Sequence, residues 1–393
     1  MKALVVDGNN MLWRALSSAS GNLTHNGKLT GGVFGFLNVL RRALYLGAPF
    51  QRAVVCWDSG TLSDRRLKVL PTYKGTRATY NPEVLEAMSP ADREAHIRRG
   101  FAFQAQLDEL KPLLNALGVV QLQMFGREAD DLIKLAADLY AEAGGRSVIV
   151  SADKDLLQLV GRDVDLLMVK PKTRSRGRVE KMVTLENFEE EIGFANPERF
   201  LLAKCIEGDA GDNVPGAHGV GAKTAAKAVD LLSDPEVDQC LAGDLDRLVA
   251  VTVGHKSKMI QRVGQPTAVP VIETAIEVIK IDREEFDEDC RVEADAALYG
   301  GEGVQLTAPE VERLFRSLGF ASLLKSFHGW VSPFRRLRSG HDDRERIRHP
   351  RGREDADDAP GRPRAHTDRP RWSGGRQRLR GPVRTRVRPR RPS

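Results

Sequence analysis

The stretch ALVVDGNN (residues 3–10) decides the fold class, because a short apolar run ends directly at an acid, Asp7. Four similar β-rich runs follow along the chain: AVVCW (53–57), VVQLQM (119–124), SVIVS (147–151) and DLLMV (165–169). Helical patterns lie between these runs, at residues 32–46, 100–117 and 128–143. Alternation of this kind predicts an α/β domain, in which helices cover a parallel sheet.

The composition excludes several classes of protein. A chain of 393 residues with 41% hydrophobic and 29% charged residues is typical of a soluble globular protein of roughly two or three domains. No apolar run approaches the roughly 18 residues of a membrane span, and the first strand is too short for a signal peptide. The four cysteines form no CxxC pair. We therefore expect no disulfide framework, no zinc site, no membrane contact and a cytoplasmic location.

The positive charge is concentrated at the C-terminal end. Residues 335–393 contain 20 Arg, no Lys and 8 acidic residues, which gives this segment a charge of +12. The chain carries +6, so the remainder carries −6. An acidic body argues against sequence-blind wrapping of DNA, but it allows an enzyme with a local basic track beside an acidic metal site.

Acidic residues follow three of the predicted strands. Asp7 ends the first, Asp58 follows the second, and Asp153 with Asp155 follows SVIVS. Because sites in open parallel sheets form at the carboxyl ends of strands, these acids are expected at one edge. A fourth group opens the helix at 128–143 and consists of Glu128, Asp130 and Asp131. The alternative is that these acids are ordinary loop residues and an N-terminal helix cap.

Convergence of four acidic groups would be costly without compensating positive charge. Two unit charges about 5 Å apart repel by roughly 3 kcal/mol at an effective dielectric near 20. Half a dozen such contacts would approach the whole stability of a domain, about 5–15 kcal/mol. The cluster is therefore expected to hold cations, and oxygen ligands without His or Cys favour Mg²⁺, with Mn²⁺ as a substitute.

Five ordered motifs resemble those of a known superfamily. They are VVDGNN (5–10), VVCWDSG (54–60) with RRLKVLPTYKGTR (65–77), GREADDLIKLAADL (126–139), SADKDLLQLV (151–160) and GDAGDNVPGAHGVGAKTAAK (208–227). Together they resemble the 5′-3′ exonuclease and flap endonuclease superfamily, in the form found in bacteriophages and in the nuclease domain of bacterial repair polymerases. The resemblance covers roughly residues 1–330.

This resemblance implies a domain organisation. Residues 1–184 would form a PIN-like catalytic domain, a parallel sheet with helices on both faces, with an arch inserted at 60–99. Residues 185–333 would form an all-helical helix-three-turn-helix domain that binds DNA. Residues 334–393, rich in Arg, Pro and Gly, would be disordered.

The resemblance also implies a metal site. The first ion would be surrounded by Asp7, Asp58, Glu128 and Asp130. The second would be served, directly or through water, by Asp131, Asp153, Asp155, Asp209 and Asp212. The resulting hypothesis is two-metal hydrolysis of DNA that leaves 5′-phosphates. Expected substrates are DNA with free 5′ ends, flaps or nicks, and RNA–DNA hybrids are a further candidate.

Basic and aromatic residues of the arch are expected to contact the substrate. Lys74 and Arg77, three apart on a predicted helix, would present cations to the phosphate near the metals; the alternative is a solvated helix face. Arg66 would reach the DNA strand. Two roles fit Tyr73, stacking on a base or packing.

A glycine-rich turn carries the second expected DNA contact. Gly216, Gly219 and Gly221 would let the backbone approach a phosphate closely, and Lys223 and Lys227 lie along one helix face. By resemblance this turn grips the uncut duplex and is a candidate K⁺ site. The alternative is an ordinary helical hairpin with glycine caps.

Some alternatives remain open. Residues 335–393 read either as an Arg-rich segment that binds phosphates or as the out-of-frame product of a GC-rich gene, and their deletion is expected to leave nuclease activity intact. The rival functions are a PIN-type ribonuclease and a catalytically inert structure-specific DNA-binding protein. We expect a monomer acting in replication or repair, with any DNA polymerase partner a separate protein.

Overall fold

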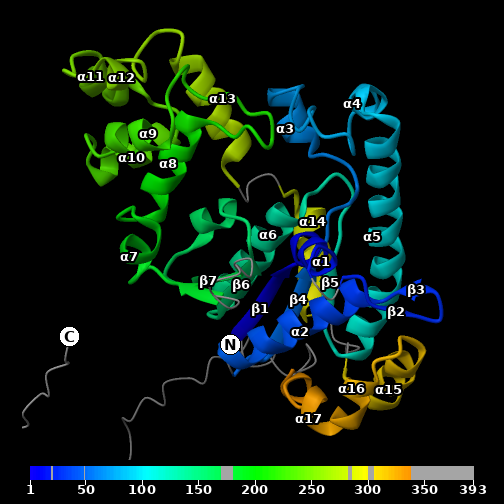
Figure 1. Ribbon diagram of the computed structural model, residues 1–393. Coiled ribbons are helices and arrows are strands. Elements are labelled where there is room, and N and C mark those ends of the chain that lie inside the picture. The colour runs from blue at the N-terminus through cyan, green and yellow to red at the C-terminus, as the bar shows by residue number, and fades with distance from the viewer. Residues whose placement is uncertain (19–20, 48, 170–179, 282–285, 300–304, 338–393) are drawn as a thin grey trace, which may run out of the picture. The chain divides into compact units, whose positions relative to one another are not determined.

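The computed structural model describes residues 1–18, 21–47, 49–169, 180–281, 286–299 and 305–337. Its centre is a six-stranded sheet in the order β5-β4-β1-β6-β7-β8 (Figure 1). Five strands are parallel: β1 (Lys2–Asp7), β4 (Arg52–Cys56), β5 (Val120–Leu122), β6 (Arg146–Ser151) and β7 (Val164–Val169). They confirm the five predicted strands. The sixth, β8 (Glu180–Val183), pairs antiparallel with β7 and was not predicted.

Helices cover both faces of the sheet, as an α/β domain requires. Leu4 and Val6 belong to a core with α1 (Gly8–Leu16), α2 (Gly31–Leu46) and α5 (Pro90–Ala116). The alternate residues Ala3 and Val5 belong to a second core with α6 (Ala129–Glu142) and α14 (Glu288–Tyr299). Because both faces are buried, the central strands are continuous apolar runs without a polar face.

A small hairpin precedes α2. Strands β2 (Thr24–His25) and β3 (Lys28–Leu29) pair antiparallel around Asn26 and Gly27, whose φ angles are 50° and 78°. An Asn-Gly pair with two positive φ angles is the preferred two-residue hairpin turn. The sequence therefore contained a hairpin signal that our prediction missed.

The expected arch contains three helical segments. These are α3 (Asp64–Val69), α4 (Pro82–Ala87) and the first part of α5. The helix predicted at 100–117 begins ten residues earlier, at Pro90, because the Ser89 hydroxyl accepts the Asp92 N–H and caps it. The first buried residue of α5 is Phe103, so its N-terminal part stands away from the core (Figure 1).

The segment that carries Lys74 and Arg77 is a turn, so the prediction that they lie on a helix was wrong. Helix α3 ends at Val69, ahead of Pro71, which disfavours helical geometry at the residue before it. Lys74 has a φ of 52°, in the left-handed region that only short turns tolerate.

The C-terminal helices fall into two groups by packing. A third core is formed by α8 (Pro197–Glu207), α9 (Ala222–Val229), α10 (Asp234–Leu241), α11 (Asp246–Val253) and α13 (Val269–Ile279). Helix α12 (Lys258–Gln261) contacts α9, whereas α7 (Phe188–Ile192) contributes Phe188 to the second core. By contrast, α15 (Ala308–Ser317), α16 (Ala321–Lys325) and α17 (Phe327–Val331) pack on the core of α2 and α5. The region expected as one helical domain, 185–333, therefore contributes to more than one core.

The segment predicted to be disordered, residues 334–393, begins at a residue that is folded into a core. Phe334, in the short 3-10 helix η2 (Phe334–Arg336), is 1% exposed and belongs to the core of α2 and α5. The rest of that prediction, residues 338–393, lies outside the described residues. Within the described residues, no helix is long and apolar enough to cross a membrane. All four cysteines are free thiols.

Candidate metal centre and nucleic-acid interface

Strand register brings the expected acids to one edge of the sheet. Asp7, at the end of β1, is paired with Cys56, at the end of β4, so Asp58 lies two residues past the end of β4. Val6 is paired with Val150, which places Asp153 just past the end of β6. The 3-10 helix η1 (Asp155–Leu159) follows directly. Asp58 Oδ1 accepts the Ala129 N–H over 2.7 Å, which fixes the start of α6 beside this edge.

Arg66 is the centre of the Glu128, Asp130 and Asp131 group. Its guanidinium lies 2.6 Å from Glu128, 3.0 Å from Asp130 and 2.9 Å from Asp131. The Arg66 residue is 1% exposed. In this structure three carboxylates attract the guanidinium inward, and a contact between Arg66 and a DNA strand stays a prediction. Burial, followed by repulsion from Asp130, raises the pKa of Asp131 to about 7 even though Arg66 opposes the shift.

Asp7 lies at the bottom of the site and is 8% exposed. Its carboxylate accepts the Ser151 hydroxyl over 2.7 Å and the Asn10 N–H over 3.1 Å. Burial raises the pKa of Asp7 to about 7, and the nearby charges of Asp58 and Asp153 add to the shift. Burial also raises the pKa of Asp58. Neither acid has enough positive charge around it to ionise at its usual pH.

The second group of acids is held by Lys204, which the sequence analysis did not identify. From α8, the Lys204 ammonium contacts Asp155 and lies 2.8 Å from Asp209. Burial, followed by repulsion from Asp153, raises the pKa of Asp155 to about 6. Burial opposes ionisation of Asp209 as well, but hydrogen bonds from Lys204 and from two backbone N–H groups hold its pKa below the usual value.

The turn at 73–77 connects the two groups of acids. The Tyr73 hydroxyl donates to Glu128 over 3.0 Å and to Asp212 over 3.3 Å. Lys74 Nζ donates to Glu128 over 2.8 Å, and the Lys74 N–H donates to the Asp212 carbonyl. Arg77 forms an ion pair with Asp212 and remains 45% exposed at its side chain. Both predicted arch cations therefore lie at the acidic site.

Tyr73 is packed in this structure. The residue is 4% exposed, and its ring contributes to the core of α8–α13. Of the two roles considered for Tyr73, the buried position fits packing and excludes stacking on a base without a rearrangement. Its hydroxyl fixes the positions of Glu128 and Asp212 instead.

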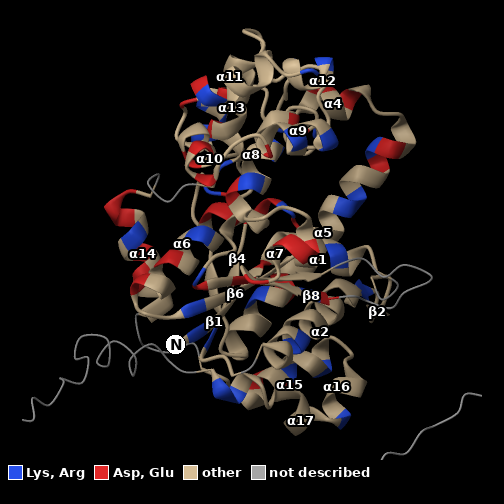
Figure 2. Cartoon of the chain, turned by 90° about the vertical axis from the view of Figure 1, so that its left-hand side faces the viewer, with Lys and Arg blue, Asp and Glu red and all other residues tan. Residues whose placement is uncertain are grey.

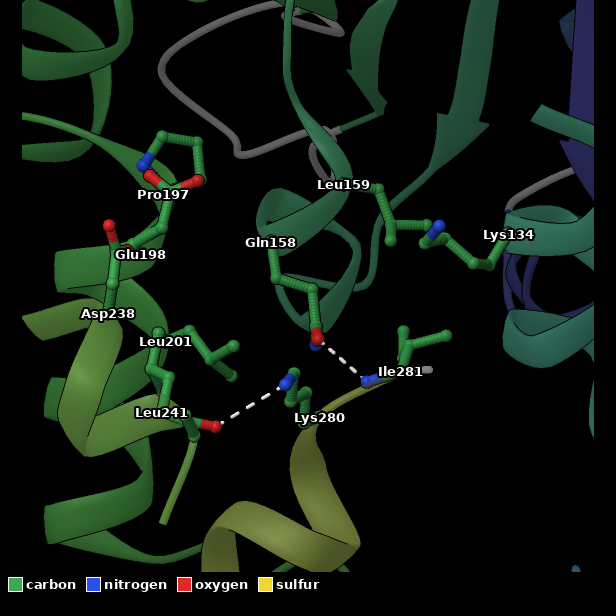
Figure 3. A pocket seen from close by; sticks show the side chains of 11 residues that line it. Lys134, Gln158, Leu159, Pro197, Glu198, Leu201, Asp238, Leu241, Lys280 and Ile281 are labelled. Atoms are coloured by element: carbon green, nitrogen blue, oxygen red, sulfur yellow. Dashed lines mark hydrogen bonds between the residues drawn. The ribbon is translucent and has the colours of Figure 1, made fainter. Parts of the chain in front are cut away.

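A small pocket of about 20 Å³, enough for one water-sized group, lies among the acids. It is lined by Arg66, Tyr73, Asp130, Asp155, Asp209, Asp212, Val214, Val278 and Ile279. A larger cavity of about 310 Å³ lies where η1, α8, α10 and the end of α13 meet, around Gln158 and Lys280 (Figure 3). None of the nine predicted acids lines that cavity. Concentration of charge, and not cavity size, therefore identifies the candidate site.

Side-chain cations already compensate part of the acidic charge. Among the residues that the structure describes, no three His, Cys, Asp or Glu side chains are arranged as a preformed metal site. Arg66, Lys74, Lys204 and Arg77 lie among the carboxylates instead. The expected compensation by cations is thus supplied in part by these basic side chains. The oxygen-only donors and the raised pKa values of Asp7, Asp58 and Asp155 still fit additional hard divalent cations.

The glycine-rich turn presents a basic, exposed helix start. Gly219 and Gly221 are exposed, as are Lys223 and Lys227 on α9, while Val220 is buried and anchors the turn. Figure 2 shows basic residues in this region, around α9 and α12. Gly216 has a different role, because a Cβ there would lie 1.9 Å from the Glu207 carbonyl oxygen. Its small size permits packing against the end of α8.

Comparison with known proteins places this arrangement in a family. The profile described as "5'-3' exonuclease, N-terminal resolvase-like domain" matches residues 2–193. The chain is 32% identical over 232 residues to a 5′-3′ exonuclease of Bacillus subtilis (strain 168), which covers 58% of this chain and 69% of that protein. It is 30% identical over 226 residues to a 5′-3′ exonuclease of Aquifex aeolicus (strain VF5), covering 57% and 68%.

A longer relative is matched over a smaller share of its own length. DNA polymerase I of Mycobacterium tuberculosis (strain ATCC 25618 / H37Rv) is 33% identical over 226 residues, which are 57% of this chain and 22% of the polymerase. The chain thus matches only about a fifth of the polymerase.

Two solved structures share the fold. T5 5′-exonuclease with bound zinc has a TM-score of 0.54 at 19% identity, and the match covers 81% of this chain and 98% of that one. The Holliday junction-resolving enzyme GEN1, in complex with product DNA and Mg²⁺, has a TM-score of 0.50 at 13% identity, covering 84% and 70%. The two bacterial 5′-3′ exonucleases, each at least 30% identical and covered over about two thirds of its length, show that the chain belongs to the 5′-3′ exonuclease family.

Proposed function

We propose that this protein is a divalent-metal-dependent 5′-3′ exonuclease and flap endonuclease that hydrolyses DNA phosphodiester bonds and leaves 5′-phosphates. The observation that carries the proposal is the single network of acids at the edge of the sheet. Residues as distant as Asp7 and Asp212 join it, and family membership supports its use in DNA hydrolysis. Replication or repair is the proposed setting.

Two sets of carboxylates are suited to hold hard cations. We assign the first ion to Asp7, Asp58, Glu128 and Asp130. We assign the second to Asp153, Asp155, Asp209 and Asp212. Mg²⁺ is the proposed ion, and Mn²⁺ should substitute for it because both favour oxygen ligands. When bound, such ions polarise the phosphate and lower the pKa of water.

The basic residues of the turn at 73–77 would position the scissile phosphate. Lys74 pairs with Glu128 of the first group, and Arg77 pairs with Asp212 of the second group. The Arg77 side chain is also partly exposed to solvent. A phosphate at this edge would meet both cations without a change of fold. Charge-assisted contacts of this kind are roughly twice as strong as neutral ones and would fix the bond to be cut.

The helices α8–α13 would hold the duplex. Their separate hydrophobic core supports a proposed DNA-binding domain of the helix-three-turn-helix type, with the glycine-rich turn as its phosphate contact. Lys223 and Lys227 would pair with successive phosphates, and the turn is a candidate K⁺ site. Residues 60–99 would form an arch over the 5′ strand.

The proposed substrates are DNA molecules with free 5′ ends, flaps or nicks, and RNA–DNA hybrids are a further candidate. We propose a cytoplasmic monomer that cooperates with a separate DNA polymerase. The match to DNA polymerase I supports such a partnership, because the matched region there is part of a longer polymerase chain.

Cleavage of a 5′-labelled flap duplex tests the proposed function. Wild-type protein and Asp153→Asn are compared with and without Mg²⁺. The matched control is Asp289→Asn, at an exposed position of α14. We expect Mg²⁺-dependent release of 5′ fragments by the wild type and Asp289→Asn, and at least a hundredfold slower release by Asp153→Asn.

The same assay separates the rival functions. Cleavage of an RNA flap with no cleavage of the DNA flap would replace the proposal with a PIN-type ribonuclease. Retention of the flap duplex without any cutting, at all Mg²⁺ and Mn²⁺ concentrations, would identify an inert structure-specific DNA-binding protein.

A further inference from the structure

Both carboxylate oxygens of Asp131 are already engaged. Oδ1 lies 2.9 Å from Arg66 Nη2, and Oδ2 lies 3.2 Å from Arg66 Nη1. Oδ2 also accepts the Glu128 N–H over 3.3 Å, as part of a capping box at the start of α6. The Asp131 side chain is 2% exposed. A metal ion could reach these oxygens only if the guanidinium moved away.

Arg66 has little freedom to move. Its Nε–H donates to the Val278 carbonyl over 3.1 Å, at the last turn of α13. The neighbouring Arg65 donates to the carbonyls of Glu277 and Lys280 at the same helix end. Carbonyls in the last turn of a helix lack intrahelical partners, so cationic donors stabilise them. The Arg66–Asp131 pair therefore joins α3, α6 and α13.

Asp130 and Asp131 differ in what they face. The Asp130 side chain is 29% exposed and lines the small pocket among the acids. Asp131 does not line that pocket, whereas Arg66 does. Both Asp131 carboxylate oxygens face the Arg66 guanidinium instead.

We propose that Asp131 is a positioning residue and not a metal ligand: through Arg66 it holds Glu128 and Asp130 at the metal site and fastens α13 to α6. This assignment differs from the one that family resemblance implies, in which Asp131 serves the second ion. It rests on the metal-dependent function proposed above, which supplies the ions that Glu128 and Asp130 hold.

The two roles predict opposite effects of removing the charge. If Asp131 pairs with Arg66, its neutralisation leaves a buried guanidinium with one partner fewer and destabilises the fold. If Asp131 binds an ion, its neutralisation weakens ion binding and relieves repulsion in the metal-free protein. Asp153, which we assign to an ion and which has no ion pair with Arg66, provides the matched comparison.

The experiment uses the full chain with Asp131→Asn, Asp153→Asn, Arg66→Gln and the double variant Arg66→Gln/Asp131→Asn. Melting temperatures are measured in EDTA, and Mn²⁺ binding is measured without DNA by calorimetry or electron paramagnetic resonance. We expect Asp131→Asn to lower the melting temperature by roughly 5 °C or more and to keep Mn²⁺ affinity within about threefold. Asp153→Asn should lose at least about tenfold in affinity and keep its melting temperature.

The double variant keeps the proposal testable if a single variant folds poorly. Removal of both partners should cost less stability than the two single losses together, because neither charge is then left unpaired. Loss of Mn²⁺ affinity in Asp131→Asn comparable to that in Asp153→Asn, with an unchanged melting temperature, would overturn the proposal. A wild-type protein that binds no Mn²⁺ would refute the metal-dependent function instead. The pairing of Arg66 with Asp131 would be refuted separately if the double variant lost as much stability as the two single variants together.

Discussion

Lys74 Nζ donates to Glu128 Oε1 over 2.8 Å, although 54 positions separate the two residues in the chain. The contact ties the turn after α3 to the first turn of α6. Because the same lysine also donates its backbone N–H to the Asp212 carbonyl, it lies between acids assigned to different ions. A cation at this point is suited to receive a phosphate that approaches both groups.

Replacement of Lys74 by Ala should slow cleavage strongly. Loss of one preorganised cation at a site of developing charge typically costs about 10²–10³ in rate. We expect a decrease of about a hundredfold in the single-turnover cleavage rate of a flap duplex. Lys325→Ala, at an exposed position of α16, is the control and should cleave at the wild-type rate. Equal rates for Lys74→Ala and wild type would remove Lys74 from the mechanism.

Replacement of Lys204 by Gln should make the protein more dependent on metal. The Lys204 ammonium contacts both Asp155 and Asp209, so its loss leaves these carboxylates to repel each other. In EDTA, the melting temperature should fall by several degrees, and saturating Mg²⁺ should raise it more than in the wild type. Lys227→Gln, exposed on α9, serves as the control for the change in net charge. An identical Mg²⁺-induced shift in all three proteins would contradict this account.

The stability of the metal-free protein should decrease as pH rises from about 5 to about 8. Burial raises the folded-state pKa of Asp7 to about 7 and that of Asp155 to about 6. At pH values between the pKa of these carboxyl groups in the unfolded state and their pKa in the folded state, the folded state binds more protons. The free energy of unfolding therefore falls as pH rises through this range. Each unit of pKa shift corresponds to about 1.4 kcal/mol.

Urea unfolding in EDTA at pH 5.5, 6.5, 7.5 and 8.5 measures this dependence. Mg²⁺ should stabilise the protein most at the upper end, because ion binding requires deprotonated carboxylates. A free energy of unfolding that stayed constant throughout the series would show that the acids are ionised at their ordinary pKa values in the folded protein.

The double variant Lys223→Ala/Lys227→Ala should bind duplex DNA more weakly, by roughly tenfold at low salt. Each phosphate contact that is lost also reduces the dependence of affinity on salt concentration. Fluorescence anisotropy at several salt concentrations measures both effects. Lys325→Ala/Arg336→Ala, at exposed positions of α16 and η2, controls for net charge. Unchanged affinity and salt dependence would exclude α9 as a duplex contact.

The sheet could be predicted because its information is local. Four or five consecutive apolar residues that end at an acid identify a buried parallel strand, and strand direction then places Asp7, Asp58 and Asp153 at one edge. The start of α6 was similarly accessible, because Glu128 and Asp131 have the spacing of a capping box.

The cations within the site could not be predicted because their partners are distant in the chain. Nothing in the sequence near Arg66 indicates that it lies among acids 62–65 positions away, and a basic residue in a polar segment more often faces solvent. Lys204 is likewise 49 positions away from Asp155 in the chain. The turn at Lys74 was missed because its positive φ angle is set by the contact with Asp212 and not by a local turn sequence.

The central claim is that acids from distant stretches of chain share divalent ions. Anomalous diffraction from crystals soaked in Mn²⁺ tests this most directly. The account predicts anomalous peaks at coordination distance from Asp58 and Glu128 and from Asp155 and Asp209, with the Lys204 ammonium displaced from the latter pair. Peaks confined to surface acids, with Lys204 still bound to Asp155 and Asp209 at saturating Mn²⁺, would contradict it.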